Sequence, residues 1–116
     1  MAGHSPHIWL LDIRGEIAGM RDLTKDATFE TFAGSRAMTR AVQHALLIIA
    51  EAAKHVPSEL KALESSVPWR QIHGLGNMLR DEYRRIDPVV LWSVVTEHLA
   101  PLDTAAAALL DRVPDE

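Results

Sequence analysis

The stretch "SRAMTRAVQHALLIIAEAAKHV", residues 35–56, contains the strongest helical pattern in the chain. Apolar residues recur at steps of three and four, which is the spacing of one helix face. That face consists of Met38, Val42, Ala45, Ile49, Ala52 and Val56, with Leu46, Leu47 and Ile48 beside it. Pro57 ends the pattern, because proline has no amide hydrogen to donate within a helix. So wide an apolar surface predicts a helix that is buried on more than one side.

Two further long helices are predicted, one on each side of this stretch along the chain. The first begins with Ser5 as N-cap and Pro6 at the first helical position, and its apolar stripe is Trp9, Ile13, Ile17 and Met20. The last begins at Asp87-Pro88, and we expect Pro101 to interrupt and bend it. Its apolar seam is Trp92, Val95, Leu99, Leu102, Ala106, Leu109 and Val113.

Shorter elements are expected between these helices. "TFETFAG", residues 28–34, predicts a helical stub ending at Gly34 in a left-handed conformation. Residues 58–74 predict an irregular connection, in which Pro68 begins one turn and Gly74 ends it. From Leu75 onward, apolar spacing predicts a helix of about two to three turns. With no two-residue alternation anywhere, the expected fold is all-α, an antiparallel bundle of about four main helices in one domain over residues 1–116.

Composition narrows the function classes. The chain is 47% hydrophobic and 24% charged, its apolar runs are far shorter than a membrane span, and it lacks a basic leader, so we expect a cytoplasmic protein. The absence of cysteine rules out disulfides and thiolate chemistry. A net charge of −4 disfavours a broad surface for duplex nucleic acid. Residues 70–85 form the one locally positive segment, with a net charge of +2 against −6 for the rest of the chain.

No cofactor and no metal are expected. The six histidines include no pair spaced four residues apart on one helix. His4 and His7 are close enough to chelate, although at a chain terminus we interpret them as incidental polarity. No glycine-rich phosphate loop follows a strand.

The segment "GLGNMLRDEYRRID", residues 74–87, carries the candidate chemistry. Its polar residues Asn77, Arg80, Asp81 and Arg84 fall on one stripe, and Tyr83 falls on the adjoining apolar stripe with Leu79. Arginines that bind phosphates beside an aromatic ring would suit single-stranded RNA. The alternative is a solvated helix with Tyr83 in the core and intrahelical ion pairs, Asp81 with Arg84 or Arg85 and Glu82 with Arg85. Spacing by itself favours this alternative.

Three blocks together resemble the HepT-like ribonuclease toxins of the HEPN superfamily: residues 41–60, 67–87 and 90–102. The resemblance covers about residues 8–112 and implies a small helical protein that forms homodimers. It also implies a minimal nucleotidyltransferase antitoxin as partner and metal-independent cleavage of RNA. The family signature is an arginine, four to six residues, a histidine, any residue and a tyrosine, usually with asparagine directly after the arginine.

Two signature positions differ in this chain. Asn77 and Tyr83 match the family asparagine and tyrosine, but Gly76 stands at the arginine position and Asp81 at the histidine position. By resemblance the catalytic residues are therefore Asp81, Tyr83 and Asn77, with Arg80 and Arg84 binding RNA phosphates. Tyr83 is also a candidate acceptor of AMP groups from the nucleotidyltransferase.

Three interpretations remain open at this point. The chain is a ribonuclease toxin, or a non-catalytic helical scaffold that binds the nucleotidyltransferase, or a toxin weakened by a tolerated or introduced change at Asp81 or Gly76. A carboxylate accepts a proton at neutral pH but seldom holds one to donate, and it repels phosphate. If loss of the histidine limits activity, Asp81→His, alone or with Gly76→Arg, should increase RNA cleavage.

Overall fold

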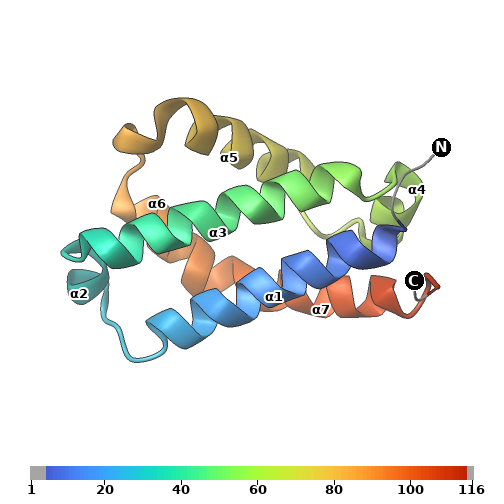
Figure 1. Cartoon of the computed structure of the whole chain (residues 1–116), viewed down its shortest axis with the longest axis horizontal. Helices are drawn as coiled ribbons and strands as arrows, with labels where there is room; N and C mark the ends of the chain where they lie inside the picture. Colours follow the sequence, from blue (N-terminus) through green and yellow to red (C-terminus); the bar gives the residue numbers. More distant parts are fainter. Residues whose placement is uncertain (1–4, 115–116) are drawn as a thin grey trace.

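Helix α3 (Arg36–His55) lies at the centre of the molecule, between α1 (Pro6–Thr24) and α5 (Trp69–Glu82) (Figure 1). The computed structural model describes residues 5–114, and within them every regular element is helical. α7 (Leu99–Leu110) packs along α1. The all-α bundle predicted from the sequence is confirmed, as is the burial of α3 from more than one side.

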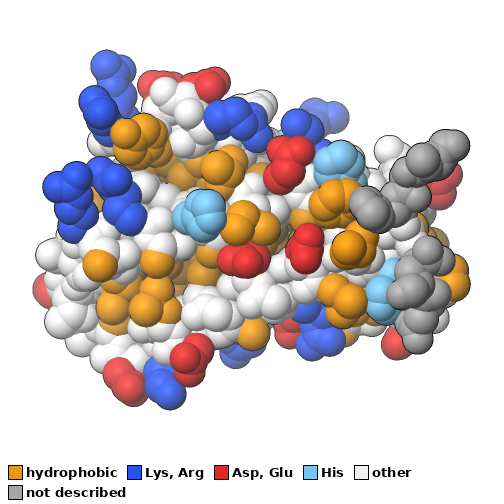
Figure 2. All heavy atoms as spheres, in the orientation of Figure 1, with side chains coloured by type: hydrophobic (Ala, Val, Ile, Leu, Met, Phe, Trp, Pro, Cys, Tyr) orange, Lys and Arg blue, Asp and Glu red, His pale blue; other side chains and the backbone are white. Residues whose placement is uncertain are grey.

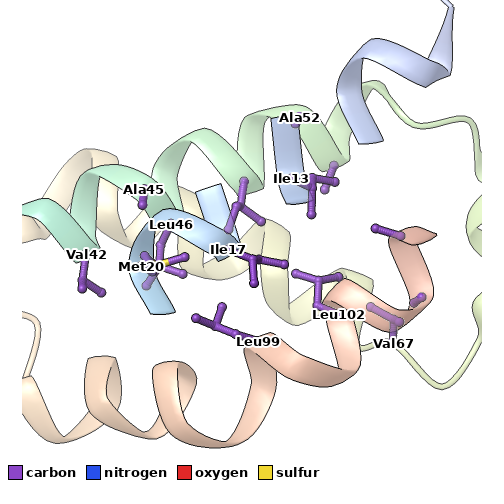
Figure 3. Close-up of a cluster of buried hydrophobic side chains, with 14 of the residues drawn as sticks. Ile13, Ile17, Met20, Val42, Ala45, Leu46, Ala52, Val67, Leu99 and Leu102 are labelled. Atoms are coloured by element: carbon purple, nitrogen blue, oxygen red, sulfur yellow. The ribbon is translucent and has the colours of Figure 1, made fainter. Parts of the chain in front are cut away.

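The core lies where α1, α3 and α7 meet. α1 contributes Ile13, Ile17 and Met20, which point between the other two helices in Figure 3 and are at most 2% exposed. α3 and α7 supply Val42, Ala45, Leu46, Ile49, Leu99, Leu102, Ala106 and Leu109 to the same cluster. The predicted stripes therefore form the core, with the outer members Trp9, Met38, Trp92, Val95 and Val113 only partly buried.

The start of α1 follows the sequence prediction, and one ion pair joins α1 to α7. The Ser5 hydroxyl caps the helix by accepting the amide of His7 at 3.2 Å. Further along, Arg14 donates from Nε to Asp103 Oδ1 at 2.8 Å and from Nη2 to Oδ2 at 3.3 Å. This hydrogen bond holds the pKa of Asp103 below its usual value and raises that of Arg14. The pair joins residues 89 positions apart in the chain.

Helix α2 (Phe29–Ala33) docks against α6 (Pro88–Ser93), with Phe32 fully buried and its ring 5.1 Å from that of Trp92. The left-handed conformation expected at Gly34 is wrong, because its φ is −83°. Ser35, the next residue, already caps α3 by accepting the amide of Met38. A Cβ at Gly34 would lie 3.2 Å from the carbonyl oxygen of Glu30, a tight contact that a small shift of the backbone would relieve.

The connection from residue 58 to 74 is more regular than predicted. α4 (Ser58–Lys61) leads directly into the 3-10 turn η1 (Ala62–Glu64), and α5 then begins at Trp69. The expected end at Gly74 is wrong, because α5 continues through it to Glu82. A glycine inside a helix costs only about 1 kcal/mol, which the packing of α5 against α3 offsets. The helix carrying the motif is therefore longer than expected, with 14 residues.

The last helical segment is interrupted, but one turn earlier than predicted. α6 is followed by a π-helical turn, η3 (Val94–His98), and only then by α7, which contains Pro101. Proline crowds the carbonyl four residues before it, here that of Glu97, and cannot donate to it. The wide turn absorbs this conflict. As a result α6 departs from the direction of α7 and reaches α2 and α3 at the other end of the molecule (Figure 1).

Candidate nucleic-acid interface

The motif is positioned by a close approach of α5 to α3. Gly76 is buried, and a Cβ built on it would lie 2.6 Å from the Cβ of Ala50. Two real Cβ atoms do not come so close, so the helices touch here only because residue 76 has no side chain. An arginine at this position, as the family signature has, could not be accommodated without separating the two helices.

Arg80 faces α3 from the next turn of α5. Its Nη1 donates to Asn77 Oδ1 at 3.0 Å, and its Nη2 lies 3.5 Å from Glu51 Oε1. Glu51 also lies 3.7 Å from Lys54 Nζ and 3.5 Å from His55 Nε2. The guanidinium is thus already partly neutralised, which weakens it as the phosphate ligand that the sequence predicted.

Tyr83 lies just beyond α5, and its ring is not part of the core. α5 ends at Glu82, and Tyr83 opens the 3-10 turn η2 (Tyr83–Arg85), held by the Gln43 side-chain amide donating to its carbonyl at 3.1 Å. The change from α-helical to 3-10 geometry after Glu82 rotates Tyr83 out of the stripe that includes Leu79. Leu79 is 4% exposed and Tyr83 38%, so the assignment of Tyr83 to an apolar stripe is wrong.

Three arginines surround this phenol, and we refer to Arg36, Arg40 and Arg84 as the arginine cluster. Arg84 Nε donates to the Tyr83 hydroxyl oxygen at 3.1 Å. The Cζ atoms of Arg84 and Arg40 lie 5.5 Å and 5.4 Å from the ring centroid, within the range of cation–π attraction. The hydrogen bond from Arg84, followed by the charges of Arg84, Arg40 and Arg36, lowers the pKa of Tyr83. Since the oxygen accepts from Arg84, the hydroxyl hydrogen is free to be donated to an incoming group.

The cluster lacks carboxylate partners. Within residues 5–114, neither Arg36 nor Arg40 nor Arg84 forms an ion pair, whereas Arg80 and Arg85 each do. Figure 2 shows arginine and lysine side chains gathered at the end of the molecule where α3 begins and α5 finishes. Unpaired cations from two elements, beside an exposed aromatic ring, form a surface suited to a polyanion.

Comparison with known proteins shows the family of this chain. The family model described as "Ribonuclease HepT-like" matches residues 13–109. The chain belongs to the HepT-like ribonuclease family of the HEPN superfamily. A protein named "Probable ribonuclease HepT" in Thermococcus cleftensis is 34% identical over 94 residues, covering 81% of this chain and 86% of that protein. A "Putative RNase" of Caldanaerobacter subterraneus is 29% identical over 108 residues, or 93% and 96% of the two chains. No solved structure matches the chain significantly.

Asp81 occupies the position of the histidine in the HepT-like signature. It lies on the side of α5 that faces away from α3. It comes five residues after Gly76, which faces Ala50, and five residues turn a helix by about 140° beyond one full turn. Asp81 lines an open hollow of about 430 Å³ together with the next four residues, Glu82 to Arg85. Of the predicted intrahelical pairs, Glu82 with Arg85 is present at 3.9 Å, and no pair of Asp81 is found within residues 5–114.

Sequence reasoning missed the contribution of α3 to this HepT-like site. Arg36 and Arg40 lie about 45 residues before Tyr83, outside the motif. One signal was available: cations in the first turns of a helix oppose its dipole, and α3 has no acidic residue in its first turn to offset them. Such a placement costs a little stability.

The metal-ligating residues are dispersed. Among the residues that the structure describes, no three His, Asp or Glu side chains are grouped to hold a metal ion. Of the terminal pair His4 and His7, the first lies outside the described residues. No helix in residues 5–114 combines the length and apolar character needed to cross a membrane.

Proposed function

We propose that this protein is an endoribonuclease, the HepT-like toxin of a toxin–antitoxin system. The observation that carries the proposal is the exposed Tyr83, whose hydroxyl is bound by Arg84 and whose ring is flanked by the unpaired Arg40. Family membership supports RNA as the substrate. A bacterial or archaeal cytoplasm is where such a protein would meet RNA.

Single-stranded RNA fits the surface better than a duplex does. Arginine guanidinium groups bind phosphate oxygens in a charge-assisted manner, and the exposed face of Tyr83 offers a stacking platform for one base. The cluster is small and the chain as a whole is acidic, with a net charge of −4. We therefore expect local contacts to a few nucleotides rather than binding along a helix of RNA.

The same groups can support cleavage without a metal ion. In RNA transesterification the 2′-hydroxyl attacks the adjacent phosphate, and the transition state gains negative charge that Arg40 and Arg84 would stabilise. Tyr83 would protonate the leaving 5′-oxygen, which its lowered pKa favours. Asn77 is held by Arg80, so its proposed role is to position that side chain. Asp81 remains a candidate through its place in the motif, where its charge opposes the approach of phosphate.

Replacing the cluster tests RNA binding directly. We expect Arg40→Gln and Arg84→Gln each to weaken binding of a fluorescent single-stranded RNA, measured by anisotropy. Each lost phosphate contact should reduce the slope of log affinity against log salt by about 0.7. Arg70→Gln is the matched control, since Arg70 is exposed at the start of α5 and outside the cluster. Equal affinities and slopes for all four proteins would rule out this surface.

The proposal includes a homodimer. Large apolar side chains are exposed close to the motif in sequence, namely Met78, Val89 and Val90, at 48%, 56% and 45%. A second copy that covered them would place two Tyr83 residues near one shared cleft. Sedimentation of the purified protein measures this state.

A second candidate function rests on the same tyrosine. A catalytically degenerate HepT-like scaffold would bind a minimal nucleotidyltransferase and accept AMP groups on Tyr83. The exposed hydroxyl and the arginines around it favour this, because they could hold the added phosphates.

Mass spectrometry tests the modification. After incubation with ATP and a nucleotidyltransferase encoded beside this chain, we expect a mass increase by whole AMP units on the wild-type protein. Tyr83→Phe should show none, because it lacks the acceptor oxygen. An equal increase on both proteins would place the acceptor elsewhere.

A further inference from the structure

An exposed histidine lies on the edge of α3 that borders the site. Arg40, His44, Leu47 and Glu51 follow one another at steps of four, three and four, so they form one stripe along the helix.

Contacts with the motif fix both ends of this stripe. At one end, Arg40 Cζ lies 5.4 Å from the Tyr83 ring. At the other, Glu51 Oε1 lies 3.5 Å from Arg80 Nη2. Gln43, the neighbour of His44 in the chain, donates to the Tyr83 carbonyl at 3.1 Å. His44 is therefore one helical turn from the arginine that flanks the phenol, and its side chain is exposed.

The Asp81 carboxylate is poorly placed for a phosphate bound on this side. Asp81 is directed away from α3, whereas two members of the arginine cluster belong to α3. A phosphate held by Arg40 and Arg84 would thus lie on the side of His44. A neutral imidazole accepts a proton without adding negative charge beside that phosphate.

We propose that His44 is the proton acceptor in RNA cleavage, supplying from α3 the imidazole that the motif lacks at Asp81. This inference rests on the proposed ribonuclease function. The imidazole takes the proton of the 2′-hydroxyl, and the oxygen forms a bond to phosphorus. The bond from phosphorus to the 5′-oxygen breaks, and Tyr83 gives that oxygen its proton. The products are a 2′,3′-cyclic phosphate and a 5′-hydroxyl, and solvent returns a proton from the imidazolium to the phenolate.

The test compares four variants with the wild type in single-turnover cleavage of a fluorescent single-stranded RNA in EDTA. We expect His44→Gln and His44→Ala to lose about 100-fold in cleavage rate, while their RNA affinity by anisotropy is unchanged. Asp81→Asn should cleave at least as fast as the wild type, because it removes a charge that opposes the approach of phosphate. His98→Gln, which alters an exposed histidine of η3, should cleave like the wild type. Free imidazole should restore part of the activity of His44→Ala but none of that of His44→Gln, where the side chain fills the site.

Three other outcomes would each overturn the inference about His44. Wild-type cleavage by His44→Gln removes His44 from the reaction and leaves the ribonuclease proposal intact. Loss of RNA affinity or of folding stability in both His44 variants, without rescue by imidazole, assigns His44 a structural role. A wild-type protein that binds RNA but cleaves none under these conditions overturns both the cleavage proposal and the role of His44.

Discussion

Tyr83→Phe is expected to reduce the rate of RNA cleavage by about 100-fold or more, the usual contribution of a general acid. Phenylalanine keeps the ring beside Arg40 and Arg84 but removes the hydroxyl that accepts from Arg84 Nε at 3.1 Å. RNA affinity should change little, because the cations and the stacking face remain. Single-turnover cleavage in EDTA, measured beside anisotropy, separates the two effects.

The position of Tyr83 makes this substitution readily interpretable. The ring is 38% exposed and lies outside the core, so its hydroxyl contributes little to folding. The Tyr83→Phe protein should therefore unfold at the same temperature as the wild type. If Tyr83→Phe cleaves RNA as fast as the wild type, Tyr83 has no chemical role, and the proposed mechanism fails at its central residue.

Gly76→Ala is expected to lower the free energy of unfolding. Overpacking should cost about 1–3 kcal/mol, and the higher helix propensity of alanine should offset about 1 kcal/mol of that cost. The added methyl group would lie 2.6 Å from the Cβ of Ala50, so α5 and α3 must move apart. Both contact partners are on helix backbones, and neither can turn aside. Urea unfolding followed by circular dichroism measures the change.

Gly74→Ala in the same helix is the matched control. A Cβ at Gly74 meets nothing within 4 Å, so this substitution should raise the free energy of unfolding by about 0.5–1 kcal/mol. Opposite signs for the two variants are the expected result. Equal stabilisation by both would show that α3 and α5 are not in contact at Gly76.

The contact at Gly76 also changes the expectation for restoring the family motif. Asp81→His alone alters an exposed position and is tolerated by the fold. Adding Gly76→Arg inserts a long side chain where a single methyl group already collides. No gain in cleavage is expected from the double variant, since it would separate the helices that position Tyr83. Little gain is expected from the single substitution, since residue 81 lies on the side of α5 away from Arg40.

Local rules account for most of the helical architecture. The Ser5 cap, the stripe from Val42 to Ala52 and the stop at Pro57 were all predicted, because capping, periodicity and proline sterics act within one or two turns of chain. The errors at Gly34 and Gly74 have one cause. A glycine alone does not reveal whether it turns left-handed and ends a helix, and at Gly34 and Gly74 the backbone stays right-handed.

The sequence by itself determined the helices, their buried faces and, through its motif blocks, the family. The tertiary structure decided which groups surround Tyr83. Arg40 lies about 40 residues before it, and the contact of α3 with α5 at Ala50 and Gly76 brings it to the Tyr83 ring. Periodicity assigns each side chain to a face of its own helix, but which faces meet depends on the packing of whole helices.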